Sequence, residues 1–278
     1  MIVAGAAVQG TAHLARGQGC QDAFKAVGLG GTAVLAVADG AGGRERSALG
    51  SHIAVDTACR VLAEGIPGAE DAPEVWTGWI AGAGARVVEE YRRAVEGVLS
   101  AVPAPEGPVE AGALASTLAA AVLRPPWVAF VSVGDCFGTV LTREPAVDEA
   151  AGAGPAAGAR ERCHLVLPPP VPGAPGTVFL SSPGAALRLR SFVLWEPRLS
   201  GVVLATDGCA SLTLDHPSVR ELPPEAGPLP SERFFCGLAA TLRANGGDAE
   251  PLRALLSGPG AARTGDDLTV LCALTDGR

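Results

Sequence analysis

The chain has few aromatic residues, few basic residues and no long hydrophobic run. Phe, Trp and Tyr make up 4% of its 278 residues, so the core must consist mainly of Val, Leu and Ala. The formal net charge of -8, without a basic stripe, argues against nucleic acid or an anionic membrane as a partner. The longest apolar run, at 113–123, is too short to cross a bilayer, and the N-terminus lacks the basic flank of a signal peptide. We therefore expect a cytoplasmic protein.

The sequence also lacks a CxxC pair. Its seven cysteines are an odd number, and several lie inside apolar segments. This pattern favours reduced, buried thiols over a disulfide framework or a zinc cluster. Hydrophobic residues, by contrast, make up 48% of the chain, which is ample for a buried sheet and argues against a disordered chain.

Aspartates recur beside strand-like apolar runs. In AVADGAGG, residues 36–43, an apolar segment leads directly into Asp39 and then into glycines, which allow a ligand to approach the backbone closely. The other aspartates of this kind are Asp22 in CQDA, Asp135 in VSVGDC, Asp207 in VVLATDG, and Asp266 with Asp267 in TGDDLTVLCAL. Singly, each aspartate could belong to a turn or a helix cap. Together they predict convergence on one site for hard divalent cations.

These residue types suit hydrolysis at phosphorus. A carboxylate that bridges two divalent ions lets them share a water whose pKa falls, so that this water can attack phosphorus in line. Asp39 is the expected bridge, and the Gly40 carbonyl is a neutral ligand. Asp207 and Asp266 would complete the site of the first ion. Asp22 would hold the second ion through water, because magnesium and manganese often keep several waters.

The spacing of apolar residues predicts an α+β chain that forms a single domain over residues 1–278. Helices are expected at 46–65, 75–97, 233–244 and 248–257. Strands are expected at 2–8, 24–29, 33–38, 114–123, 127–135, 136–143, 163–167, 177–182, 191–195, 202–206 and 268–274. An irregular crossover is expected at 213–232, a loop at 101–112, and a flexible Ala/Gly/Pro-rich insertion around 144–176. In such a chain helices cover the outer faces of packed, mainly antiparallel sheets.

The order of the motifs CQDA, AVADGAG, VGD, ATDG and GDDLTV resembles that of the metal-dependent protein phosphatase 2C family. The opening GTAH at 10–13, followed by CQDA at 20–23, is similar to a bacterial subgroup of this family. The resemblance covers residues 4–275 and implies a four-layer α/β/β/α sandwich with two central sheets. It also implies hydrolysis of phosphoserine or phosphothreonine with two Mn²⁺ or Mg²⁺ ions. By motif, the metal ligands would be Asp22, Asp39, Gly40, Asp207 and Asp266, with Asp135 on a weaker third ion.

Two positions near the expected site lack a family side chain. Many members have DGHGG, whose His is a candidate general acid, but Ala41 stands at that place here. His13 is the alternative acid, and the competing interpretation is a hydrogen-bonded structural histidine. Members often have an acid four residues after the Asp of the DG motif, where this chain has Ser211, which affects the third ion.

The phosphate-binding arginine of many members is also missing from its usual place. Gly17 and Gln18 fill that neighbourhood before CQDA. Arg44 and Arg46 follow the glycine turn and lie close enough in sequence to meet an anion beside the metals. Surface arginines at the start of a helix are the competing interpretation.

We therefore expect a bacterial serine/threonine protein phosphatase in which Asp39, His13 and Arg44 act on the substrate. Its partner would be a phosphorylated protein, either a cognate serine/threonine kinase or the target of that kinase. The alternative is a pseudophosphatase that keeps the fold and binds a phosphoprotein without turnover. A third hypothesis is a phosphatase for a small phosphorylated metabolite, because the sequence shows no clear specificity pocket.

Overall fold

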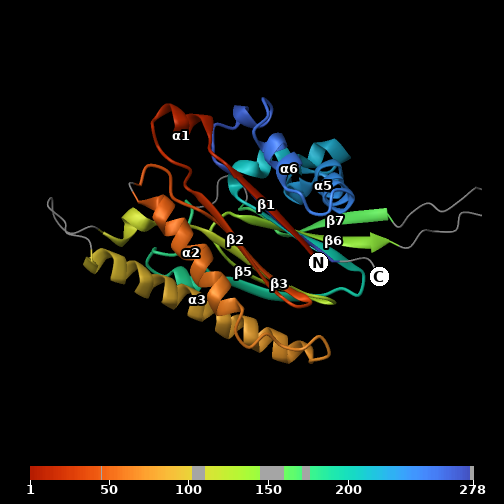
Figure 1. Cartoon of the computed structure of the whole chain (residues 1–278), viewed down its shortest axis with the longest axis horizontal. Coiled ribbons are helices and arrows are strands. Elements are labelled where there is room, and N and C mark those ends of the chain that lie inside the picture. The colour runs from red at the N-terminus through yellow and green to blue at the C-terminus, as the bar shows by residue number, and fades with distance from the viewer. Residues whose placement is uncertain (45, 102–109, 145–159, 171–175, 276–278) are drawn as a thin grey trace, which may run out of the picture.

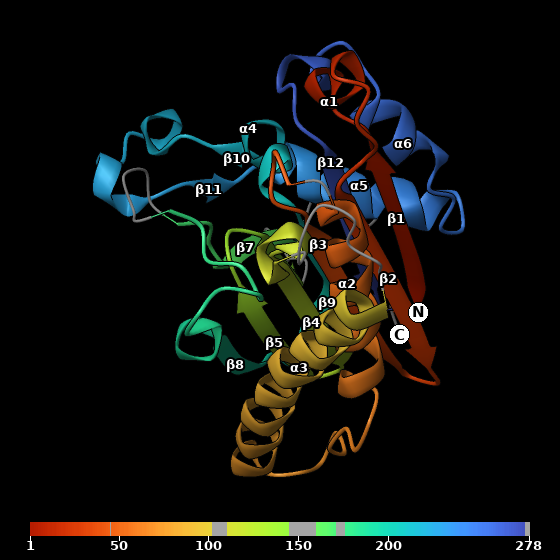
Figure 2. The same cartoon turned by 90° about the vertical axis from the view of Figure 1, so that its left-hand side faces the viewer.

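Two stacked five-stranded sheets form the centre of the molecule (Figures 1 and 2). The computed structural model describes residues 1–278 except 45, 102–109, 145–159, 171–175 and 276–278. The first sheet has the order β1 (Ile2–Val8), β12 (Leu268–Leu274), β9 (Leu199–Ala205), β6 (Phe137–Glu144) and β7 (Arg160–Leu167). The second has the order β2 (Asp22–Leu29), β3 (Thr32–Asp39), β4 (Leu118–Arg124), β5 (Trp127–Val133) and β8 (Arg190–Trp195). All neighbouring strands within these two sheets are antiparallel.

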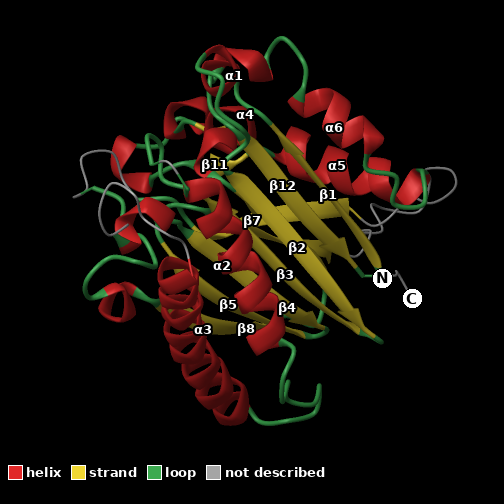
Figure 3. Ribbon diagram, turned by 60° about the vertical axis from the view of Figure 1, so that its left-hand side comes forward, coloured by secondary structure: helices red, strands yellow, loops and turns green. Residues whose placement is uncertain are grey.

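Helices cover both outer faces of the sheet pair, as Figure 3 shows. The second sheet is covered by α2 (Ser47–Leu62) and α3 (Pro73–Ala101), and the first by α5 (Glu232–Ala244) and α6 (Glu250–Leu256). The remaining helices and strands are short: α1 (Thr11–Ala15), α4 (Ala210–Thr213), and the ribbon of β10 (Leu214–Asp215) and β11 (Leu229–Pro230). The expected four-layer α/β/β/α sandwich is confirmed.

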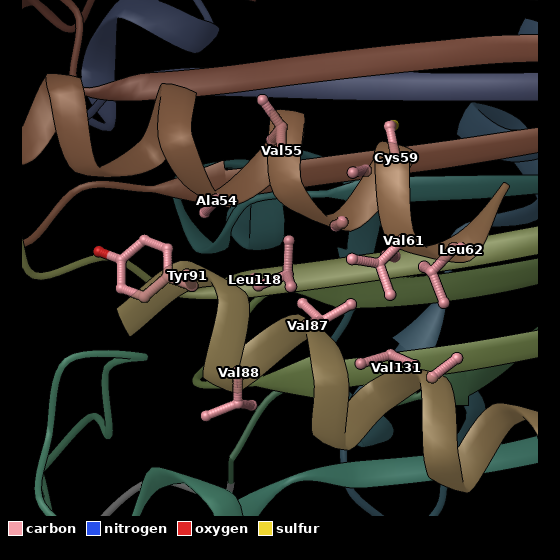
Figure 4. Packing of buried hydrophobic residues seen from close by; sticks show 14 of the residues in the cluster. Ala54, Val55, Cys59, Val61, Leu62, Val87, Val88, Tyr91, Leu118 and Val131 are labelled. Atoms are coloured by element: carbon pink, nitrogen blue, oxygen red, sulfur yellow. The ribbon is translucent and has the colours of Figure 1, made fainter. Parts of the chain in front are cut away.

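Three apolar layers hold these four layers together. Between the two sheets, β3, β5, β9 and β12 contribute buried side chains that include Leu35, Phe130, Leu204 and Leu271. Under α2 and α3, Val87 packs with the β4 and β5 residues Leu118 and Val131 (Figure 4). A third cluster joins α5 and α6 to the outer face of the first sheet. Apolar burial in these layers contributes roughly 25 cal/mol per Å² to stability. Because the buried side chains are closely packed, the strands and their ends have little freedom to move.

Local turn chemistry sets the register of the second sheet. The β2–β3 hairpin turns at Gly30-Gly31, and Gly30 has a φ of +66°, a conformation that glycine adopts without steric cost. The predicted turn at Pro125-Pro126 is confirmed, since it joins β4 to β5 and leaves Arg124 paired with Trp127. These two hairpins pair β2 with β3 and β4 with β5.

Some expected elements differ in the structure. The predicted strand at 177–182 is wrong: these residues are irregular, and the Leu180 amide donates to the Ser116 carbonyl at 2.8 Å instead of joining a ladder. The edge position beside β5 is taken by β8 and not by this segment. Helix α1 was not expected at all. Much of the expected loop at 101–112 and of the insertion around 144–176 lies outside the described residues.

The cysteines and the helices agree with the compositional predictions. All seven cysteines are free, and burial is confirmed for Cys59, Cys136, Cys163, Cys209 and Cys272. None of the helices in the described part of the chain combines the length and the apolar character that crossing a bilayer would require.

Candidate metal centre

Two of the predicted ligands come from neighbouring strands of the second sheet. Asp22 begins β2 and Asp39 ends β3, and the two residues are direct partners in the antiparallel register. Directly opposed residues point to the same face of a sheet, with Cβ atoms about 4.5–5.5 Å apart. Two carboxylates in this arrangement repel each other unless a cation or a proton compensates them.

The first sheet supplies two more carboxylates from its adjacent strands. Asp207 follows the end of β9, and Asp266 lies just before β12. The Thr206 amide donates to the Thr269 carbonyl at 3.1 Å, which holds these two strand ends together. Asp135 lies in the connection from β5 in one sheet to β6 in the other.

Stacking of the two sheets brings these carboxylates together. One carboxylate oxygen each from Asp39, Asp135 and Asp207 lie within 4.8 Å of one another. They line a pocket of about 210 Å³, together with Asp266 and His13. The structure therefore brings these four aspartates to one pocket, and their binding of a cation stays a prediction. A larger pocket of about 550 Å³ beside α2 contains one carboxylate, which is exposed, so it offers no comparable cation site.

Asp22 is buried next to Asp39 and does not line the pocket. Its side chain accepts a hydrogen bond of 2.7 Å from Thr206 Oγ1. Its charge nevertheless acts on Asp39 and contributes to the raised pKa of that group.

Burial and mutual repulsion raise the pKa values of the clustered carboxyl groups. The pKa of Asp39 rises to about 10, first because burial disfavours the charged form and then because the neighbouring aspartates add negative potential. Burial raises the pKa of Asp22 to about 7, although the hydrogen bond from Thr206 acts in the opposite direction. Burial, followed by the charges of Asp135 and Asp266, raises the pKa of Asp207 to about 6. A divalent cation would remove this penalty by favouring the ionised forms.

Two residues of the pocket lining, Asp135 and Gly40, offer oxygen atoms. Asp135 Oδ1 is buried and has no hydrogen-bond partner among the described residues, while its Oδ2 accepts from Thr177 Oγ1 at 2.6 Å. At Gly40 a Cβ atom would lie 2.6 Å from the Ser47 carbonyl oxygen, so only glycine lets the chain pass this close to α2. Carboxylate and carbonyl oxygens are the donors that Mg²⁺ and Mn²⁺ prefer.

His13 lies in α1 and is 7% exposed. Its Nδ1 lies 2.9 Å from Asp267 Oδ2, which is an ion-pair distance without the alignment of a hydrogen bond. Among the described residues that line the pocket, His13 is the one with a basic side chain.

The two arginines after the glycine turn lie outside the pocket lining. Arg44 is exposed, and its backbone carbonyl accepts a hydrogen bond from Ser47 Oγ at 3.1 Å. Arg46 is partly buried, and its amide donates to the Ala113 carbonyl at 3.2 Å. A phosphate role for Arg44 therefore stays a prediction.

Sequence reasoning missed two polar residues around the centre and gave no separate role to a third. Thr206 supports Asp22 and Thr177 supports Asp135, whereas Asp267, already named with Asp266, contacts His13. Thr206 could have been noticed, because it belongs to the ATDG motif. Thr177 lies outside every motif and carries no such signal.

Comparisons with solved structures agree with this architecture. The serine/threonine phosphatase Stp1 from Staphylococcus aureus is 14% identical with a TM-score of 0.55, and the match covers 100% of this chain and 96% of that one. The Mycobacterium tuberculosis serine/threonine phosphatase PstP/Ppp is 16% identical with a TM-score of 0.54, and coverage is 99% and 100%. PppA from Pseudomonas aeruginosa is 19% identical with a TM-score of 0.51, and coverage is 97% and 95%. At these identities the likeness concerns the fold.

Sequence comparison assigns the family. A search of curated proteins finds no match. The profile of the family described as Protein phosphatase 2C matches residues 9–257, which is most of the chain and includes Asp22, Asp39, Asp135 and Asp207. This chain belongs to the protein phosphatase 2C family.

Proposed function

We propose that this chain is a metal-dependent serine/threonine protein phosphatase that hydrolyses phosphoserine and phosphothreonine in proteins. The observation that carries the proposal is the meeting of Asp39, Asp135, Asp207 and Asp266 around one pocket. Family membership supports the phosphatase chemistry. The raised carboxyl pKa values support metal dependence, because such a cluster is costly to ionise without a cation.

The chain's own oxygen atoms would hold two Mn²⁺ or Mg²⁺ ions. Asp39 would bridge them, the Gly40 carbonyl, Asp207 and Asp266 would complete the first site, and Asp22 would hold the second through water. Asp135 would hold a weaker third ion. When bound, such ions lower the pKa of a coordinated water and screen the charge of the phosphate.

His13 would act on the leaving group, as the general acid. The departing serine or threonine oxygen is a strong base, so it leaves more easily if a proton reaches it during bond cleavage. His13 lines the pocket, and Ala41 at the family's histidine position has no acidic or basic group. Arg44, on the exposed turn after Gly43, would approach the substrate phosphate.

The small size of the pocket supports the proposed substrate class. The pocket of about 210 Å³ has the size of a phosphoryl group with its ligands and offers few contacts to a larger metabolite. A phosphorylated side chain carried on a protein surface fits this shape. We propose a cognate serine/threonine kinase or its target as the partner, with the single domain acting in the cytoplasm.

A phosphothreonine peptide tests the proposal. Released phosphate is measured with Mn²⁺, with Mg²⁺ and with EDTA. Turnover should require the metal and should fall at least about a hundredfold in Asp39→Asn, because the bridging carboxylate is lost. Asp56→Asn removes an exposed carboxylate on α2 that pairs with Lys25, and it should behave as wild type.

Other outcomes would identify a different function. Binding of Mn²⁺ and of the phosphopeptide without turnover would contradict the proposal and indicate a pseudophosphatase. Hydrolysis of sugar phosphates in preference to phosphopeptides would indicate a metabolite phosphatase.

A further inference from the structure

Asp267 is a buried carboxylate that the proposed metal ligands do not include. It is 2% exposed. Its Oδ1 accepts a hydrogen bond of 2.6 Å from the Gly10 amide, and its Oδ2 accepts one of 2.6 Å from the Gln21 amide. His13 Nδ1 lies 2.9 Å from the same Oδ2. Gly10 follows β1 of the first sheet and Gln21 precedes β2 of the second. Asp267 therefore holds both ends of the segment 10–21, which connects the two sheets.

Backbone contacts dock this segment against the residues before β12. The Ala12 amide donates to the Gly265 carbonyl at 2.9 Å. At Gly10 a Cβ atom would lie 2.3 Å from the Asp266 carbonyl carbon, so no other residue permits this approach. The position of α1, and of His13 on it, is therefore set by the same stretch that carries Asp266 and Asp267.

The contact with Asp267 decides which edge of the His13 ring faces the pocket. The two ring nitrogens point in different directions, and Nδ1 is turned toward Asp267. Nε2 is then the nitrogen available to the pocket that His13 lines. A carboxylate beside Nδ1 favours a proton on that nitrogen. Such contacts are often imperfectly aligned before substrate binds.

We propose that Asp267 is a positioning residue that holds His13 so that Nε2 delivers the proton to the leaving oxygen. The inference deepens the proposed function and rests on it. The oxygen of the attacking water bonds to phosphorus, and the bond from phosphorus to the serine or threonine oxygen breaks with its electron pair on that oxygen. The Nε2 proton of the imidazolium moves to this oxygen, and the neutral ring keeps its Nδ1 proton toward Asp267. The proton lost by the attacking water goes to solvent, from which His13 is protonated again.

A carboxylate suits this place better than an amide. Both oxygens of Asp267 accept from backbone N–H groups, and one of them also faces His13. An asparagine has only one acceptor oxygen, so its NH₂ group would face a backbone donor whichever way it turned. Asp267→Asn therefore loosens the hold on His13 while keeping the size of the side chain.

Leaving-group dependence separates this role from a structural one. Asp267→Asn, His13→Gln and the double variant are assayed with Mn²⁺ on a phosphothreonine peptide and on para-nitrophenyl phosphate, whose leaving group is a weak base. We expect His13→Gln to lower kcat on the peptide by about 10²–10⁴-fold. Asp267→Asn should lower it at least about tenfold, with each loss on the peptide at least about tenfold larger than on the aryl phosphate.

The kcat of the double variant on the peptide should be no lower than that of His13→Gln alone, because the effect of Asp267 passes through His13. Equal losses of Asp267→Asn on both substrates, or a further loss in the double variant, would overturn the proposal. Melting temperature and Mn²⁺ affinity are measured for each variant. A loss of Mn²⁺ affinity in Asp267→Asn would also overturn it, by making Asp267 a metal ligand.

An NMR measurement tests the orientation without relying on activity. The chain has four histidines, so the ring ¹⁵N signals of the metal-free protein can be assigned by comparison with His13→Gln. The neutral His13 ring should carry its proton on Nδ1, and Asp267→Asn should shift protons to Nε2. A wild-type ring protonated on Nε2 would overturn the inference, even if Asp267→Asn failed to fold. If wild type hydrolysed neither substrate, the proposed function would fail, while the tautomer would still report whether Asp267 orients His13.

Discussion

Mn²⁺ should stabilise the folded protein more at pH 8 than at pH 5. The pKa values of Asp207, Asp22 and Asp39 are raised from 3.8 to about 6, 7 and 10 in the metal-free fold. A raised folded-state pKa gives stability that is fully present below pH 3.8 and is lost as the pH rises through the folded value. The metal-free protein therefore loses stability between about pH 4 and pH 10. A bound dication offsets this loss, because it favours the ionised carboxylates.

Asp207 alone sets a lower bound on the effect. A rise in pKa from 3.8 to about 6 corresponds to about 3 kcal/mol of lost stability when the group is fully ionised. About 1.4 kcal/mol of this loss falls between pH 5 and pH 8. For a chain of this length 1 kcal/mol changes the melting temperature by about 2 °C. The Mn²⁺-induced shift should therefore be at least about 3 °C larger at pH 8 than at pH 5.

Differential scanning calorimetry measures this difference with 1 mM EDTA or with one fixed Mn²⁺ concentration at both pH values, on the order of a hundred times the Kd at pH 8. Asp39→Asn should lose most of the Mn²⁺-induced shift at pH 8. Asp56→Asn, which changes charge equally but on the exposed face of α2, should keep it. An equal shift at both pH values, or a wild-type shift in Asp39→Asn, would refute the electrostatic reasoning.

Three other substitutions test the support around the centre. Gly40→Ala should cost about 1–3 kcal/mol in urea unfolding with EDTA, because the new Cβ would meet the Ser47 carbonyl at 2.6 Å; unchanged stability would mean that α2 moves aside freely. Thr206→Val should weaken Mn²⁺ binding about 10–100-fold by calorimetry, since it removes the hydrogen bond to Asp22; unchanged affinity would show that this bond does not orient the carboxylate. Trp76→Ala should cost about 3–5 kcal/mol, because Trp76 is fully buried and stacks on a second tryptophan; a loss below 1 kcal/mol in urea unfolding would show that α3 contributes little to the core.

Local patterns were sufficient to predict most of the strands and the aspartates at their ends. The run before Asp39 is almost continuously apolar because β3 is buried between a neighbouring sheet and α2. Asp207 is recognisable for the same reason, since it follows the fully buried strand β9. A polar residue at the end of such a run can be recognised from the sequence alone. Its meeting with the other aspartates depends on how the sheets stack. The repeated pattern predicted that the aspartates converge, and the family resemblance implied the pair of stacked sheets that brings them together.

Contacts between distant segments could not be read from local patterns. The stretch at 177–182 has the composition of a strand, but β8 takes the place beside β5, and the Leu180 amide donates to the Ser116 carbonyl outside any ladder. Helix α1 is only five residues long and owes its place to contacts with Gly265 and Asp267. The approach of His13 to Asp267 joins residues near opposite ends of the chain, so no sequence window contains both.

The pairing of β1 with β12 has a consequence for how the protein is made. β1 is the edge strand of its sheet, its neighbour there is β12, and Ile2 pairs with Leu274. During synthesis on a ribosome, the first strand must therefore wait for nearly the whole chain to emerge before it finds its place. Asp266 arrives with that same late strand, so a nascent or truncated chain lacks both a closed sheet and a full set of acidic groups.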